Sequence, residues 1–230
     1  MFSHVFLAVT GREMEEYNPK RTAYLSCHFS PYGKGLSNLP NTLPPGSLLI
    51  LDDSMPPEQH DPEIIYEELT GFIQQFSPKG ILLDFQNKPT EKAKAMAAFL
   101  TQRLPCPVAA TPAYAKELDC PVFLPPPPAN RQLKDYLAPW QKQGIYLEIA
   151  PEALTITVTE KGSIVAQIPP VYNLPLRNSR LHCHYNVSVF PDKAVFTLSR
   201  NKEDLQALIR EAEKLGVHAT VGLYWELQNL

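Results

Sequence analysis

An apolar segment of the chain ends in two polar side chains that could do chemistry together. The segment runs from Lys79 to Gln86 and presents Asp84 and Gln86 two residues apart. Because successive side chains of a strand alternate between its faces, Asp84 and Gln86 would lie on the same face. A carboxylate transfers protons or stabilises positive charge, whereas an amide only forms hydrogen bonds. We therefore expect a cleft in which Asp84 takes part in catalysis and Gln86 forms hydrogen bonds to the substrate.

Polar residues follow other apolar segments in the same way. Asp52 and Asp53 end one run, and Glu148 lies near the end of another. Barrel enzymes place their catalytic groups at the carboxyl ends of strands. We expect Asp84 and Glu148 to be the catalytic pair. The expected substrate-binding residues are Gln86, Trp225, Tyr224, Asp52, Asp53 and His28.

The elements that must position these side chains alternate between strands and helices. Continuous apolar runs predict buried strands, and apolar residues three or four apart predict the helices between them. The expected strands are 22–29, 47–53, 80–86, 107–111, 121–124, 145–149 and 219–226. The expected helices are 61–77, 90–104, 130–143 and 202–215. This alternation is typical of parallel βα units.

Two β-hairpins are expected in the second half of the chain, over residues 154–168 and 185–198, where apolar and polar side chains alternate around a turn. The pattern predicts one α/β domain over residues 1–230, a (β/α)8 TIM-type barrel, complete or lacking some helices, with a β-hairpin elaboration. An open doubly wound sheet is the rival architecture. Whether residues 1–20 contain a strand is left open.

The segment from Lys79 to Gln86 resembles the signature strand of the family 18 glycosidases, the chitinases and their spore-wall relatives. That signature is roughly Asp-Gly-x-Asp-x-Asp-x-Glu, with the last Glu as general acid. Gly80 and Asp84 match it, and Gln86 occupies the position of the acid. The segment from Gly222 to Trp225 is similar to the closing strand of the same family, whose Trp forms the floor of the sugar subsite. An indole face suits that task because sugars offer apolar C–H faces.

The resemblance implies a barrel that binds an amino-sugar-containing glycan. In the family, the substrate's acetamido group attacks the anomeric carbon, and the residue equivalent to Asp84 orients that group. Gln86 has no proton to donate, so Glu148 or Glu226 would have to act as the acid. Neighbouring strand residues face opposite sides, so a Trp225 that stacks under the sugar would point Glu226 into the helices.

A second candidate site lies at His182-Cys183-His184, where two imidazoles would share one face of an extended segment. A His-x-His pair together with an aspartate such as Asp84 is a spacing that can hold zinc for hydrolysis. No further histidine stands at a supporting spacing. A metal-dependent hydrolase that uses His182 and His184 is therefore kept as an alternative, while we expect no metal and no cofactor.

Composition excludes several classes of protein. The 21 basic and 24 acidic residues give a net charge of −3, without general attraction to nucleic acid or anionic lipid. No apolar run approaches the ~18 residues of a membrane span, and the segment from Met1 to Val9 lacks the basic region of a signal peptide. The four scattered cysteines fit reduced thiols. We expect a cytoplasmic protein with a carbohydrate ligand and no nucleic-acid or membrane partner; its oligomeric state is left open.

The sequence thus predicts a glycoside-hydrolase-like barrel that binds an amino-sugar-containing glycan. Whether the protein hydrolyses this glycan is left open. One alternative is a catalytically inactive barrel that binds a glycan or a partner, and the other is the metal-dependent hydrolase.

Overall fold

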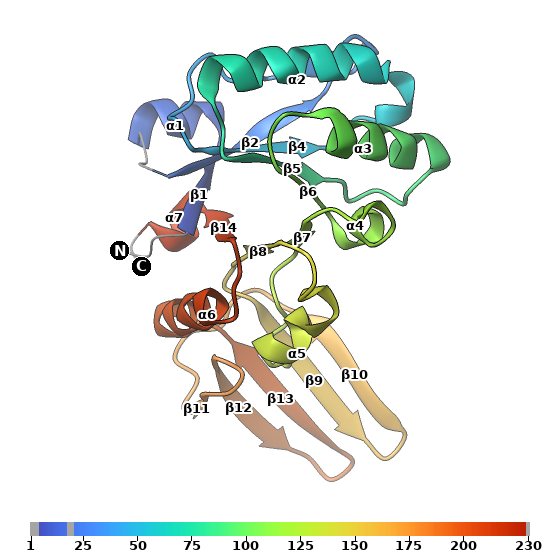
Figure 1. Cartoon of the computed structure of the whole chain (residues 1–230). Helices are drawn as coiled ribbons and strands as arrows, with labels where there is room; N and C mark the ends of the chain where they lie inside the picture. The colour runs from blue at the N-terminus through green and yellow to red at the C-terminus, as the bar shows by residue number, and fades with distance from the viewer. Residues whose placement is uncertain (1–4, 18–20, 229–230) are drawn as a thin grey trace.

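The computed structural model describes residues 5–17 and 21–228, and its larger part is a closed barrel of eight parallel strands (Figure 1). The strands are hydrogen-bonded in the order β1-β14-β8-β7-β6-β5-β4-β2, and pairing of β1 with β2 closes the ring. They are β1 (Val5–Val9), β2 (Thr22–Phe29), β4 (Leu48–Asp52), β5 (Gly80–Asp84), β6 (Val108–Ala110), β7 (Val122–Leu124), β8 (Ile145–Glu148) and β14 (Ala219–Leu223). The predicted barrel is confirmed, because an open sheet would lack the closing pair.

The first barrel strand is β1, a segment for which the sequence left strand and lead-in open. β1 pairs with β14 on one side and with β2 on the other. The strand 22–29, which the sequence analysis counted as the first, is therefore the second strand of the barrel. Residues 1–4 and 18–20 of the open range lie outside the described residues.

Helices surround the barrel and follow most of its strands (Figure 1). They are α1 (Gly11–Tyr17), η1 (Pro57–Gln59), α2 (Pro62–Phe76), α3 (Glu91–Arg103), α4 (Pro112–Leu118), α5 (Leu133–Leu137), η2 (Ala138–Trp140), α6 (Lys202–Lys214) and α7 (Tyr224–Leu227). The side chain of Asp61 caps α2, and Asn201 and Asp204 form a reciprocal capping box on α6. The helix after Thr111 exists but is short, and the expected helix 130–143 is replaced by α5 and η2. None of the helices in the described part of the chain is long and apolar enough to cross a membrane.

Strand alternation fills the barrel interior and points carboxylates to one end of it. Apolar side chains of alternate residues form an inner cluster that includes Leu48, Leu82 and Tyr146. On the same inward faces, Asp52 lies two residues after Ile50, Asp84 two residues after Leu82, and Glu148 two residues after Tyr146, each closer to the carboxyl end of its strand. Three acids therefore meet at the carboxyl mouth of the barrel.

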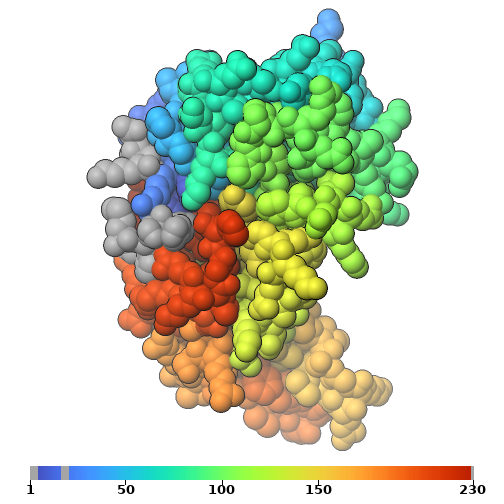
Figure 2. All heavy atoms as spheres, viewed as in Figure 1, coloured from blue at the N-terminus to red at the C-terminus, as the bar shows by residue number. Residues whose placement is uncertain are grey.

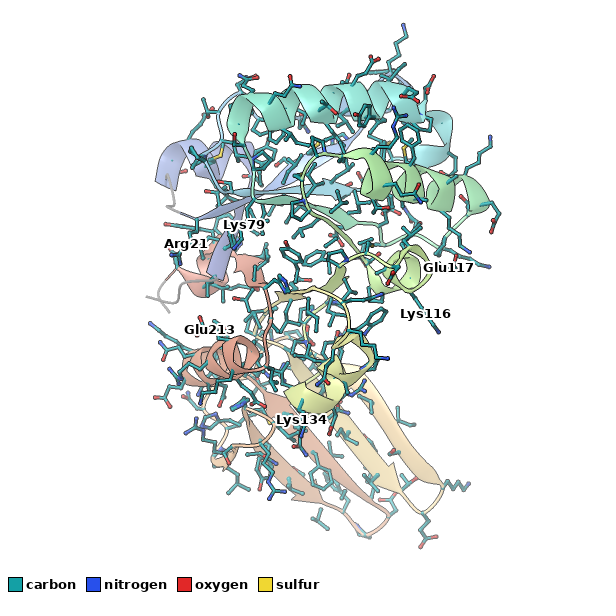
Figure 3. The ribbon with its side chains drawn as sticks, viewed as in Figure 1. Arg21, Lys79, Lys116, Glu117, Lys134 and Glu213 are labelled. Atoms are coloured by element: carbon teal, nitrogen blue, oxygen red, sulfur yellow. The ribbon has the colours of Figure 1, made fainter. Side chains whose placement is uncertain are left out.

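A different residue of the signature segment lies at the opposite end of the barrel. Lys79 lies just before β5 (Figure 3). Its ammonium group lies 5.2 Å from the centroid of the Phe6 ring. The position at which the family 18 signature begins with an aspartate is thus a lysine at the amino end of the barrel.

An antiparallel sheet of five strands is inserted between β8 and α6. Its order is β10-β9-β13-β12-β11, and it extends away from the barrel as a separate lobe (Figures 1 and 2). The strands are β9 (Ala153–Thr159), β10 (Gly162–Gln167), β11 (Leu176–Asn178), β12 (Cys183–Val189) and β13 (Lys193–Ser199). Both predicted hairpins are confirmed, β9 with β10 and β12 with β13. A further short strand, β3 (Leu36–Ser37), pairs antiparallel with β2 outside the ring.

Arg200 joins this sheet to the barrel. Its side chain is only 1% exposed and donates hydrogen bonds to the carbonyl oxygens of Leu181, His182, Pro127 and Pro128. Burial lowers the pKa of the guanidinium to about 10, so it remains charged. One side chain therefore ties the proline loop after β7 to the end of β13 and the segment before β12.

Replacing Arg200 with methionine should destabilise the protein strongly. The substitution leaves several buried carbonyl oxygens without a donor, and we expect the free energy of unfolding to fall by about 3 kcal/mol. Urea denaturation followed by circular dichroism measures this change. Arg210→Met, on the exposed side of α6, is the matched control and should change little. Equal effects of the two substitutions would contradict the role assigned to Arg200.

Candidate active site

A pocket of about 250 Å³ opens at the carboxyl end of the barrel. Its lining comes from β1, β2, β4, β5, β7, β8 and β14, so it sits at the mouth where the parallel strands converge. The lining residues are Ala8, Leu25, Ile50, Asp52, Asp84, Phe123, Glu148, Val221, Gly222 and Leu223. The pocket is therefore an apolar hollow that contains three carboxyl groups.

Asp84 lies partly buried at this mouth, and its nearest polar partner is Gln86. The Gln86 side-chain amide donates a hydrogen bond to Oδ1 of Asp84. Burial raises the pKa of Asp84, the hydrogen bond from Gln86 opposes this rise, and the charges of Asp52 and Asp53 add to it. Gln86 thus acts here as a donor that orients Asp84 and favours its ionised form.

The pKa of Glu148, the acid that β8 brings to the pocket, is strongly raised. Burial is the main cause of its rise to about 7, and the negative charges of Asp84, Glu226 and Glu152 contribute further. A carboxyl group with this pKa is still protonated in a large fraction of the protein molecules at neutral pH. Glu148 is therefore suited to donate a proton, while a neighbouring carboxylate carries charge.

Asp52 shares the pocket with Asp84, because the two residues are paired in register on the adjacent parallel strands β4 and β5. Its Oδ1 accepts a hydrogen bond from the Ser54 backbone amide at 2.8 Å. Asp52 therefore adds negative charge directly beside Asp84.

Asp53 was expected to bind substrate, but the structure gives its carboxylate another task. The side chain is 3% exposed, and its two oxygens accept hydrogen bonds from the backbone amides of Gln86 at 2.8 Å and Asn87 at 3.0 Å. Asn87 in turn donates to the Asp53 carbonyl at 2.6 Å. Asp53 does not line the pocket and instead fixes the loop that carries Gln86.

His28 reaches the same end of the barrel because of an irregularity in β2. The register between β2 and β4 shifts between Tyr24 and Cys27, which pairs His28 with Asp52. His28 Nδ1 lies 2.8 Å from the Phe29 carbonyl, to which it donates, and Nε2 accepts from the Asn38 amide at 3.1 Å. Both ring nitrogens are thus engaged, and His28 lies outside the pocket lining.

Tyr224 and Trp225 are not on a strand, so the expected strand 219–226 is wrong beyond Leu223. The chain turns into α7 at Tyr224, and Trp225 is 53% exposed outside the pocket. Close packing just before this point requires glycine at position 222 of β14, since a Cβ there would lie 2.4 Å from the Ile149 carbonyl oxygen. Trp225 and Glu226 are therefore neighbours on a helix and do not face opposite sides of a strand, contrary to expectation.

A second pocket of about 250 Å³ adjoins the segment that follows β8. Its lining includes Glu152 and Glu226, which both contribute to the raised pKa of Glu148. The sequence analysis gave Glu152 no role, because no apolar strand points to it. The sequence does place Glu152 only four residues after Glu148, and this short separation could have indicated that the two acids lie near each other.

His182 and His184 contact different carboxylates rather than converging on one point. His182 has a left-handed backbone conformation (φ 47°), so the segment is not extended, and its ring contacts Glu211. His184 Nδ1 lies 2.7 Å from Asp204 Oδ2, also on α6. In the part of the chain that the structure describes, no group of three or more His, Cys, Asp or Glu residues could hold a metal. The pair serves to attach the inserted sheet to α6.

The barrel and its mouth define a fold of the family 18 glycoside hydrolase kind, and solved structures bear this out. The spore cortex-lytic enzyme SleL of Bacillus cereus superposes with a TM-score of 0.55 at 10% identity, over 95% of this chain and 70% of that chain. A GH18 chitinase from Cycas revoluta, solved in complex with (GlcNAc)4, gives a TM-score of 0.55 at 9% identity, over 96% of this chain and 94% of that one. No protein-family signature and no curated protein matches the sequence. At these identities the likeness concerns the fold.

Proposed function

We propose that the protein binds an amino-sugar-containing glycan at the carboxyl mouth of its barrel and hydrolyses a glycosidic bond there. The observation that carries this proposal is that Asp84 and Glu148 line one pocket at the carboxyl ends of the barrel strands, where burial raises the pKa of Glu148 to about 7. Glycosidases use two carboxyl groups in different protonation states, and the environments of these two differ. The solved neighbours that are named as chitinases support the class of ligand.

The proposed reaction begins with proton donation from Glu148 to the glycosidic oxygen. The bond between that oxygen and the anomeric carbon breaks, and the electron pair remains on the leaving oxygen. The Asp84 carboxylate, oriented by Gln86, stabilises the positive charge that develops on the sugar ring. A water molecule then adds to the anomeric carbon and returns its proton to the Glu148 carboxylate.

The general acid would then be Glu148 on β8, and not a residue at the end of β5. In family 18 the acid ends the signature strand, where this chain has Gln86. An amide cannot replace that acid, so Glu148 has to supply the proton from the other side of the mouth.

A survey of fluorogenic glycosides and chitin oligosaccharides on the purified protein tests this function. We expect turnover that survives treatment with a chelator, because the proposed groups are carboxyl groups. Turnover lost to the chelator, with zinc present in the preparation, would overturn this function and favour the alternative built on His182 and His184.

A glycan-binding barrel without catalysis is the second candidate, and the amide at Gln86 is the observation that favours it. Gln86→Glu distinguishes the two. If Glu148 is the acid, the new carboxylate repels Asp84 and turnover should fall about tenfold. The control Gln74→Glu, on the exposed face of α2, should leave turnover unchanged. A native protein that only binds, together with turnover gained by Gln86→Glu, would support the inactive barrel instead.

A further inference from the structure

The inserted sheet leaves the outer side of β10 without a neighbouring strand. β10 is the first strand in the order β10-β9-β13-β12-β11, and it forms a free edge of the lobe (Figure 1). All six of its residues, from Gly162 to Gln167, are exposed. A free edge presents backbone N–H and C=O groups that can pair with another strand. Among the described residues, no strand occupies this edge.

The register of the hairpin shows which backbone groups of β10 face outward. Just after β10, the Ile168 amide donates to the Ala153 carbonyl at 3.1 Å, so these two residues form a hydrogen-bonded pair. Such pairs alternate with non-hydrogen-bonded pairs in an antiparallel ladder, and the even-numbered residues of β10 therefore bond to β9. The amides and carbonyls of Ser163, Val165 and Gln167 point to the free edge.

The side chains of β10 lack the features that usually prevent strand addition. Soluble proteins protect a sheet edge with charged residues, proline or a bulge. β10 has neither a charged residue nor a proline, and its register with β9 is uninterrupted. Two of its exposed side chains are apolar, Ile164 at 71% and Val165 at 52% exposure. Pairing with another strand would remove apolar surface from water at this edge.

We propose that β10 pairs antiparallel with β10 of a second copy of this chain, so that the two inserted sheets become one. A two-fold axis at Val165 engages all the outward groups, because Val165 then faces its own copy and Ser163 faces Gln167. A shifted register leaves some of these groups unpaired. In this arrangement valine meets valine and polar side chains meet polar ones, as a self-complementary interface requires.

Charges at the two ends of β10 favour the same register. Lys161 is exposed at the turn before β10, and Glu152 lies beside the other end, where its Oε2 is 3.5 Å from Gln167 Nε2. The β9–β10 register, continued by two residues, places Glu152 opposite Pro169. The two-fold axis places Lys161 of the second copy on the other side of that proline, about 10 Å from Glu152 between backbones. Both long side chains lie on one face and can meet, once at each end.

Sedimentation velocity of the full chain tests this dimer. One six-residue ladder buries less than the about 1,200 Å² of a standard interface, so we expect a reversible dimer with a Kd of about 10–100 µM. The native protein should change from monomer to dimer between about 1 µM and about 1 mM. Monomer throughout that range would overturn the second copy as the occupant of this edge.

Substitutions at Val165 test the contact itself. Val165→Pro removes the amide at the two-fold axis and leaves the ladder to β9 intact, so it should abolish the dimer. Val165→Lys places like charges opposite each other and should weaken the dimer about tenfold. The control Val189→Lys, at a side chain of β12 that is 79% exposed, should have no effect. Circular dichroism shows that each variant is folded. A dimer that survives both changes at Val165, or that dissociates in Val189→Lys, would overturn the proposal.

Charge reversal tests the register. Lys161→Glu and Glu152→Lys each place like charges opposite each other at both ends of the ladder, and each should weaken the dimer about fivefold. The double variant restores opposite charges and should recover the native affinity. A double variant that is weaker than either single variant would overturn the two-fold register at Val165.

Discussion

Glu148→Gln should lower the turnover of an oligosaccharide by about 10²- to 10⁴-fold, the usual contribution of a general acid. Glutamine keeps the shape of the side chain but has no acidic proton. The loss should be much smaller on an aryl glycoside with an acidic leaving group, because that leaving group departs without protonation. Steady-state kinetics on the two substrate types measures this difference.

A matched control for this substitution is Glu160→Gln, which should retain full turnover. Equal losses on both substrate types would contradict proton donation by Glu148 and would indicate a binding role. Full activity of Glu148→Gln would exclude Glu148 from the reaction.

The same substitution should also change stability in a pH-dependent manner. The pKa of Glu148 rises from its ordinary value of 4.5 to about 7 in the folded protein. Ionisation is therefore less favourable in the folded state, and the native protein loses stability as the pH rises from the unfolded pKa to the folded one. Above pH 7 the glutamine variant should be more stable than the native protein by up to about 3 kcal/mol, as measured by urea denaturation.

Asp84→Asn should lower turnover by about 10²- to 10³-fold, because the neutral amide no longer stabilises positive charge on the sugar. It should also shift the alkaline limb of the pH–rate profile to lower pH. The direction follows because the negative charge of Asp84 helps to raise the pKa of Glu148, and its removal lets that pKa fall.

The control for this substitution is Asp192→Asn, at the exposed turn between β12 and β13. It should alter neither the rate nor the profile. An alkaline limb that stays in place or moves to higher pH in Asp84→Asn would contradict the coupling between the two carboxyl groups.

Much of the barrel was predictable because its strands and helices have simple periodicities. The continuous apolar run before Asp84 and the capped helix that begins after Asn201 were both placed correctly. The alternating hairpins also formed as expected. Asp84 and Glu148 were expected at the mouth because each lies at the carboxyl end of an apolar strand.

Other features depend on tertiary contacts that no local pattern reveals. The carboxyl-terminal segment from Tyr224 is apolar enough for a strand, yet β14 ends at Leu223 and the chain continues as α7. A register shift between β2 and β4 pairs His28 with Asp52, and sequence periodicity alone does not reveal such a shift. Asp53 was indistinguishable from Asp52 in sequence, because only the folded loop brings the amides of the residues after β5 to its carboxylate.

The pH dependence of kcat/KM for hydrolysis by the native protein tests the central claim most directly. The measurement uses chitin oligosaccharides across the range from acidic to alkaline pH. The claim that Glu148 is the general acid predicts a rate that falls as the pH rises through about 7, the pKa of that carboxyl group. Absence of turnover at every pH, or a rate that stays constant from neutral to alkaline pH, would contradict it.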